Sequence, residues 1–158
     1  MVAPGRAAVP SWPVSDVLVA SDSPSVVDEV SSCLGKETTL RKVPTGRQIR
    51  AAVAELRPDL VVLDLQTGSM GGMAACLDLR LEEGAGRLPR VPVLMLLDRR
   101  PDVFLARRSS ADGWVLKPLD PVRLRKAITQ LMSGGTYEDP SRVPPTVAVP
   151  AEPVVPAN

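Results

Sequence analysis

The chain contains no histidine among its 158 residues. This absence excludes acid–base catalysis by imidazole, metal ligation by imidazole and catalytic triads of the usual kind. It also excludes a role as a phosphohistidine carrier. Any chemistry must therefore come from carboxylate, amine, hydroxyl or thiol groups.

Aromatic residues, cysteines and long apolar runs are also scarce. Only 3% of the residues are aromatic, so we expect an aliphatic core. No apolar run reaches the length of a membrane span, and no signal peptide is recognisable, so we expect a cytoplasmic protein with no membrane partner. Cys33 and Cys76 lie far apart in helical patterns, which favours buried thiols over a disulfide. The net charge of +1 gives no general attraction to nucleic acid.

Short apolar runs alternate with helical patterns along the chain. The run at residues 60–63 is the clearest, because it consists only of Leu and Val and suits a strand buried on both faces. The expected strands are 17–20, 37–43, 58–64, 91–97 and 112–116, and the expected helices are 24–34, 46–56, 72–83, a short one within 98–110, and 121–131. Right-handed crossovers then predict a three-layer α/β sandwich with a doubly wound, five-stranded parallel sheet in the order 2-1-3-4-5.

The two ends of the chain differ in composition from the middle. Prolines among small residues mark the first segment, and two glycines followed by many prolines mark the last. Such segments cannot bury enough apolar surface to fold. We therefore expect a disordered arm over residues 1–14, one folded domain over 15–133 and a disordered proline-rich tail over 134–158.

Polar residues follow three of the expected strands directly. Asp22 follows the first strand, Asp64 ends the third and Lys117 follows the fifth. The carboxyl ends of parallel strands meet at one edge of the sheet, where ligands bind. Two carboxylates at that edge favour a divalent cation such as Mg²⁺, and an ammonium group nearby suits a phosphoryl oxygen. An aspartate that only starts a turn and a solvated lysine at a strand end are the alternative interpretations.

Three stretches carry a resemblance to a known family: residues 17–24 (VLVASDSP), 58–65 (PDLVVLDL) and 111–118 (ADGWVLKP). Their combination is similar to the receiver domain of bacterial two-component response regulators. The resemblance implies a flavodoxin-like, receiver-like fold for the domain. It also implies a signalling protein rather than an enzyme, with self-catalysed phosphoryl acceptance at most.

The resemblance also implies a role for each matching residue and for the partners. Asp64 is the expected phosphoacceptor and Lys117 the expected phosphoryl contact. Asp22, Asp64 and the backbone carbonyl of Gln66 are the expected Mg²⁺ ligands. The expected phosphodonor is a histidine kinase or a phosphotransfer protein. A downstream protein is expected to bind the face formed by the fourth helix, fifth strand and fifth helix. A homodimer is a further possible partner arrangement.

Four positions depart from the family pattern. Ser21 replaces one of two acidic residues after the first strand, and Leu97 replaces the Thr or Ser whose hydroxyl binds the phosphoryl group. Asp98 replaces a small residue beside the acceptor, and Trp114 replaces a smaller aromatic at the switch position. Leucine has no hydrogen-bond donor, so we expect the usual phosphate-driven switch to be altered.

Two functions remain open from the sequence. The first is a stand-alone, atypical response regulator that accepts a phosphoryl group on Asp64 with Mg²⁺. The second is a phosphorylation-independent pseudo-receiver that acts as a protein-interaction module. Residues 133–158 are too few and too rich in proline for a DNA-binding domain, so none is expected.

Overall fold

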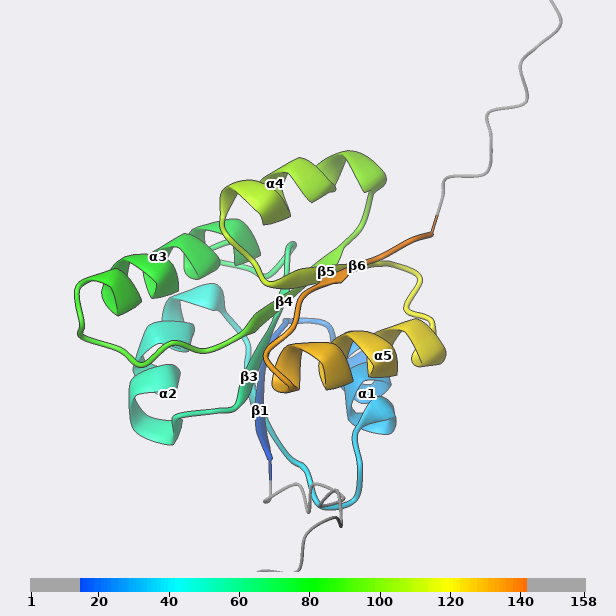
Figure 1. The fold of residues 1–158 in the computed structure, drawn as a ribbon, viewed down its shortest axis with the longest axis horizontal. Coiled ribbons are helices and arrows are strands. Elements are labelled where there is room, and N and C mark those ends of the chain that lie inside the picture. Colours follow the sequence, from blue (N-terminus) through cyan, green and yellow to red (C-terminus); the bar gives the residue numbers. More distant parts are fainter. Residues whose placement is uncertain (1–14, 142–158) are drawn as a thin grey trace, which may run out of the picture.

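The computed structural model describes residues 15–141 and contains a parallel sheet of six strands (Figure 1). The strands are β1 (Asp16–Ala20), β2 (Thr39–Val43), β3 (Leu60–Asp64), β4 (Val93–Leu97), β5 (Gly113–Leu116) and β6 (Tyr137–Glu138). Their order is β2-β1-β3-β4-β5-β6, and every pair is parallel. The predicted fold class and the predicted order of the first five strands are confirmed.

Five α-helices connect the strands and cover both faces of the sheet (Figure 1). They are α1 (Pro24–Cys33), α2 (Ile49–Leu56), α3 (Gly72–Gly84), α4 (Val103–Arg108) and α5 (Pro121–Met132), and short 3-10 turns at Gly46–Gln48 and Arg100–Asp102 precede α2 and α4. Buried side chains of α1 and α5 pack on one face, and those of α2, α3 and α4 pack on the other. The fourth helix is short, as predicted.

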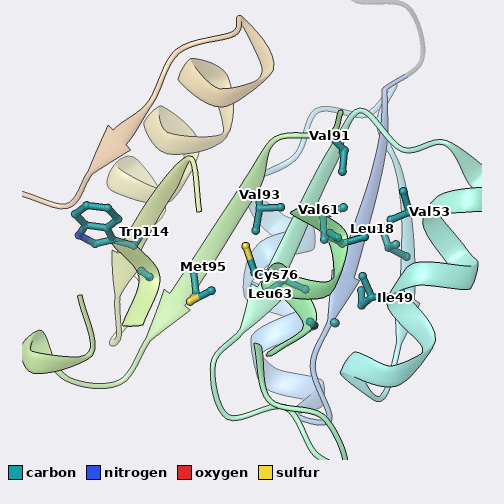
Figure 2. Close-up of a cluster of buried hydrophobic side chains, with 14 of the residues drawn as sticks. Leu18, Ile49, Val53, Val61, Leu63, Cys76, Val91, Val93, Met95 and Trp114 are labelled. Carbon is teal, nitrogen blue, oxygen red and sulfur yellow. The ribbon is translucent and has the colours of Figure 1, made fainter. Parts of the chain in front are cut away.

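Alternate residues of each central strand enter the two cores. In β1, Leu18 faces the core under α2 and α3, whereas Val17 and Val19 face α1 and α5. All residues of β3 and β4 are buried, which explains their unbroken apolar runs. Figure 2 shows the first core, where aliphatic side chains dominate and Trp114 lies at one end.

The state of the two cysteines and the length of the helices agree with the sequence prediction in the described residues. Cys33 and Cys76 are both buried free thiols, as predicted. Cys76 donates to the carbonyl of Ser109 across the contact of α3 with α4. Within residues 15–141 no helix is long and apolar enough to cross a bilayer.

The sixth strand lies beyond the domain boundary that the sequence predicted. The predicted tail began at residue 134, but residues 134–141 are part of the described structure, and β6 pairs with β5. The cause is local: Tyr137 and Asp139 are buried, and both make contacts with distant parts of the chain. The rest of the predicted tail and the predicted N-terminal arm lie outside the described residues.

Candidate functional site

The carboxyl ends of four adjacent strands meet at one edge of the sheet. β1 is followed by Ser21 and Asp22, β3 ends at Asp64, β4 is followed by Asp98, and β5 is followed by Lys117. The structure therefore brings the predicted site residues to the same edge, as the parallel topology requires.

Asp64 is almost fully buried, with 2% of its surface exposed, and both of its carboxylate oxygens accept hydrogen bonds. Oδ2 accepts from the Ser21 hydroxyl at 2.9 Å. Oδ1 accepts from the Lys117 ammonium at 2.8 Å and from the Gln66 backbone amide at 3.2 Å. The ammonium group and the two further donors thus give this buried carboxylate hydrogen-bond partners on both oxygens.

Lys117 bridges two carboxylates. Its Nζ lies 2.8 Å from Asp64 Oδ1 and 3.3 Å from Asp98 Oδ1, with 21% of the side chain exposed. Burial alone would lower the pKa of Lys117, but hydrogen bonds and charge attraction from Asp64 and then Asp98 outweigh it and raise that pKa above its usual value. The amine therefore remains an ammonium group at neutral pH. The peptide bond from Lys117 to Pro118 is cis.

A tightly packed loop follows Asp64. A Cβ added to Gly72 would lie 2.7 Å from the carbonyl oxygen of Asp64, so the first residue of α3 packs directly on the end of β3. The Thr67 amide donates to the same carbonyl at 3.1 Å, and Thr45 forms an isolated bridge with Gly68. These contacts hold the loop, and with it the Gln66 amide, next to the Asp64 carboxylate.

The oxygen donors near Asp64 match the preferences of Mg²⁺, which takes few carboxylates and keeps several waters. Asp22 is exposed, and a Cβ added to Gly68 would lie 3.2 Å from its Oδ2, which places this carboxylate over the loop after β3. Among residues 15–141, no group of three or more acidic, Cys or His side chains is arranged to hold a metal. Asp22, Asp64 and the Gln66 carbonyl stay the predicted ligands, and two carboxylates alone would make such a site weak.

The two altered switch positions are both buried. Leu97 has 0% of its surface exposed and lies in the core beneath α2 and α3, so it presents only methyl groups at the position of the expected hydroxyl. Trp114 belongs to the same core. The Arg107 guanidinium lies 5.2 Å from the centre of its ring, a cation–π distance. The indole is therefore buried and also contacts a guanidinium group.

Two contacts of the site are not evident from the sequence. Ser21 departs from the family pattern, yet its hydroxyl donates directly to Asp64. Asp139 lay in the predicted tail, yet it bonds the amide of Leu116, the residue before Lys117. Its neighbour Tyr137, one of few aromatic residues, was the only available sign of a buried segment.

Curated relatives of the chain are response regulators. It is 38% identical over 111 residues to the DNA-binding response regulator MtrA of Mycolicibacterium smegmatis, covering 68% of this chain and 46% of that protein. It is 30% identical over 121 residues to the nitrate/nitrite response regulator protein NarL of Escherichia coli, covering 75% and 55%. The chain thus spans about half the length of these relatives. The partner prediction included no DNA-binding domain. The comparisons contradict it, because the MtrA relatives are named as DNA-binding response regulators.

Solved structures and a family model agree with these relatives. The chemotaxis response regulator CheY4 of Vibrio cholerae shares the fold with a TM-score of 0.65 and 24% identity, over 75% of this chain and 98% of that one. The BeF₃-activated receiver domain of RstA from Klebsiella pneumoniae has a TM-score of 0.64 and 26% identity, over 75% and 98%. The model of the response regulator receiver domain matches residues 17–129. The chain therefore belongs to the response regulator receiver domain family.

Proposed function

We propose that this receiver domain accepts a phosphoryl group on Asp64 and works in a cytoplasmic phosphorelay. The observation that carries the proposal is the ammonium group of Lys117 at 2.8 Å from a buried carboxylate, at the tip of the central strand β3. A paired cation at this distance would lie where negative charge moves during the transfer. The comparisons support signalling as the function, since the relatives are named as response regulators.

The proposed transfer balances with the groups of the site. A carboxylate oxygen of Asp64 attacks the phosphorus of a phosphodonor, a new O–P bond forms, and the donor leaves with the electron pair of the broken bond. Lys117 stays protonated and offsets charge on the equatorial oxygens. When bound by Asp22, Asp64 and the Gln66 carbonyl, Mg²⁺ would neutralise further charge on the phosphoryl group. Charge neutralisation by Lys117 and Mg²⁺ suits phosphoryl transfer, whose catalysis is mainly positioning and electrostatic stabilisation.

Two features make us expect slow acceptance. Ser21 supplies a hydroxyl where a second carboxylate would strengthen cation binding. Asp98 lies beside the ammonium group at 3.3 Å and repels an incoming phosphoryl group while competing for Lys117. The reaction therefore depends more heavily on Lys117 than it would with three acidic ligands.

The experiment is incubation of the full chain with acetyl phosphate, with and without millimolar Mg²⁺, followed by intact-mass measurement. We expect a gain of one phosphoryl group that requires Mg²⁺ and is lost in Asp64→Asn. Asp59→Asn is the matched control, because Asp59 is an exposed carboxylate at the opposite end of β3 that bonds the Asp16 amide. No mass gain in the wild-type chain, or an equal gain in Asp64→Asn, contradicts the proposal. The phosphorylation-independent alternative receives no support from the comparisons.

A further inference from the structure

The last described residues lie along the edge of β5 (Figure 1). We call residues 137–141 the C-terminal strap. Its strand, β6, pairs with β5 on one side only and contains two residues. Tyr137 is buried in the core of α1 and α5, and Asp139 is buried as well, whereas Glu138 between them is exposed. The strap is thus a short edge strand with one buried face.

One carboxylate makes most of the polar contacts of the C-terminal strap. The Asp139 side chain has 0% of its surface exposed. It accepts hydrogen bonds from the Leu116 amide at 2.8 Å, the Ser141 amide at 2.7 Å and the Arg123 guanidinium at 2.6 Å. Charge-assisted bonds of this length to a buried group are costly to lose, because the remaining partners are left unpaired.

The partners of Asp139 stand at the two ends of the loop that carries Lys117. Leu116 is the residue before Lys117, and Arg123 lies in the first turn of α5. The Arg123 amide also donates to Asp120, the N-cap of that helix. Both ends of the loop are therefore attached to the same buried carboxylate. The backbone amide of Lys117 itself is held by the Leu97 carbonyl at 2.8 Å.

We propose that Asp139 is a positioning residue for Lys117, and that the C-terminal strap and the Asp64 site are energetically coupled through the loop between β5 and α5. While Asp139 holds Leu116 and Arg123, the Lys117 ammonium is kept on Asp64. Coupling of this kind is reciprocal, so a change at Asp64 loosens or tightens the strap by the same free energy with which the strap acts on the site. The effect on phosphoryl acceptance rests on the function proposed above, whereas the coupling itself does not.

The C-terminal strap lies at the edge of the described sheet. Its backbone contacts include the Tyr137 amide to the Asp112 carbonyl at 3.2 Å and the Arg100 guanidinium to the Ser141 carbonyl at 2.6 Å. Gly134, with φ of +87°, and Gly135 separate the strap from α5. Edge segments of a sheet open at lower free energy than its central strands, so exchange of the strap amides can be measured separately from that of β1. The β5 backbone also approaches the strap closely, since a Cβ added to Gly113 would lie 2.8 Å from the Tyr137 carbonyl oxygen.

The test measures amide hydrogen exchange in the full chain and the rate of phosphoryl acceptance from acetyl phosphate. Asp139→Asn keeps the shape of the side chain and removes its charge. Glu138→Gln is the matched control, because it neutralises the neighbouring carboxylate, whose ion pair with Arg107 is long at 3.7 Å and exposed. We expect Asp139→Asn to accelerate exchange of the Leu116 and Ser141 amides by ~10-fold or more and to slow acceptance by ~3-fold or more, and Glu138→Gln to do neither.

A third variant separates failure of this inference from failure of the proposed function. Asp64→Asn removes the negative charge that holds Lys117, and no phosphodonor is needed. We expect faster exchange of the strap amides in this variant, with the amides of β1 unchanged. Wild-type exchange of the strap in Asp64→Asn overturns the coupling, and so does an Asp139→Asn protein that matches Glu138→Gln. Faster strap exchange in Asp139→Asn with an unchanged acceptance rate reduces Asp139 to a structural role and also overturns it.

If the wild-type chain accepts no phosphate, the proposed function fails, and the exchange measured in Asp64→Asn still decides the coupling. If Asp139→Asn does not fold, Arg123→Gln is measured in its place. That variant removes one of the three hydrogen bonds to the carboxylate and leaves the two backbone amides bound. The same outcomes then apply.

Discussion

Replacing Ser21 by aspartate tests the electrostatics of the site directly. The Ser21 hydroxyl now donates to Asp64 Oδ2 at 2.9 Å, and both residues are buried. Ser21→Asp exchanges this donor for a second negative charge. Two charges ~4 Å apart at an effective dielectric constant of ~20 repel by ~4 kcal/mol. The Lys117 ammonium, at 2.8 Å from Asp64, offsets a part that we take as about half of this repulsion.

The lost hydrogen bond adds to that repulsion. A hydrogen bond to a charged acceptor contributes ~1.5 kcal/mol. Together the two effects lower the free energy of unfolding by ~3 kcal/mol, which for a domain of this size corresponds to a fall in Tm of ~10 °C. Because the new carboxylate also completes an acidic cluster with Asp22 and Asp64, the variant should bind Mg²⁺ more tightly than the wild type. At a Mg²⁺ concentration of ~100 times Kd, binding raises the free energy of unfolding by ~2.7 kcal/mol.

The assay is urea unfolding of wild type, Ser21→Asp and Ser21→Asn, each with and without Mg²⁺. Ser21→Asn is the control of similar polarity without charge, and its stability should not respond to Mg²⁺ more than the wild type does. Equal stability of Ser21→Asp and wild type without Mg²⁺ would refute the repulsion. An equal Mg²⁺ response in Ser21→Asp and Ser21→Asn would show that the added carboxylate is not a ligand, and that Ser21 does not face the cation position.

Three further predictions follow from named contacts. Leu97→Thr combined with Asp98→Ala should enlarge the amide chemical-shift response to phosphorylation beyond that of Asp98→Ala alone, because only the double variant supplies a hydroxyl; an equal response in both would contradict the account of Leu97. Arg80→Met should lower the free energy of unfolding, measured by urea titration, by ~3 kcal/mol, because Arg80 joins the largely buried Glu83 and Asp112. Arg50→Met should cost under ~1 kcal/mol, because Arg50 itself is 54% exposed and its pairs with Asp78 and Glu82 are long, at 3.3 and 3.4 Å. Equal losses would count against the network. Burial opposes ionisation of Asp139, but hydrogen bonds from Leu116, Ser141 and Arg123 outweigh it and hold its pKa below the usual value. The contribution of Asp139 to stability is therefore present above the unfolded pKa of ~3.9 and is lost as pH falls through the folded pKa. The Leu116 amide shift should therefore titrate only below pH ~3.9 in wild type, and a midpoint above that value would contradict the assigned direction.

The main site residues were predictable because a parallel sheet brings the residues that follow its strands to one edge. Asp64 and Lys117 each follow a buried apolar run, and strands of this kind end at a common edge. The pairing of Asp64 with Lys117 needed only that rule. The direction of the Ser21 hydroxyl needed more, since a serine after a strand has many partners within reach, and only the packed loop selects Asp64.

The C-terminal strap shows where such reasoning stops. β6 has too few residues for a hydrophobic period to appear in the sequence, and glycines and prolines surround it. Its place depends on Asp139, whose partners Leu116 and Arg123 are distant in sequence. No local propensity records a contact of that range. The composition of the segment predicted disorder, and tertiary contacts overrode it.

The two oxygens of Asp64 are held differently, and this asymmetry bears on how the residue can act. Freeing Oδ1 means breaking the bonds from the Lys117 ammonium and the Gln66 amide. Freeing Oδ2 means turning away one hydroxyl, that of Ser21, which can rotate about its C–O bond. The second step costs about one hydrogen bond, ~1.5 kcal/mol, and leaves the ammonium in place. Under the function proposed above, Oδ2 is the oxygen that would attack a phosphodonor, while Lys117 stays paired with Oδ1. In that proposal Ser21, where the family has an acidic residue, would control access to the attacking oxygen as well as the strength of the predicted cation site.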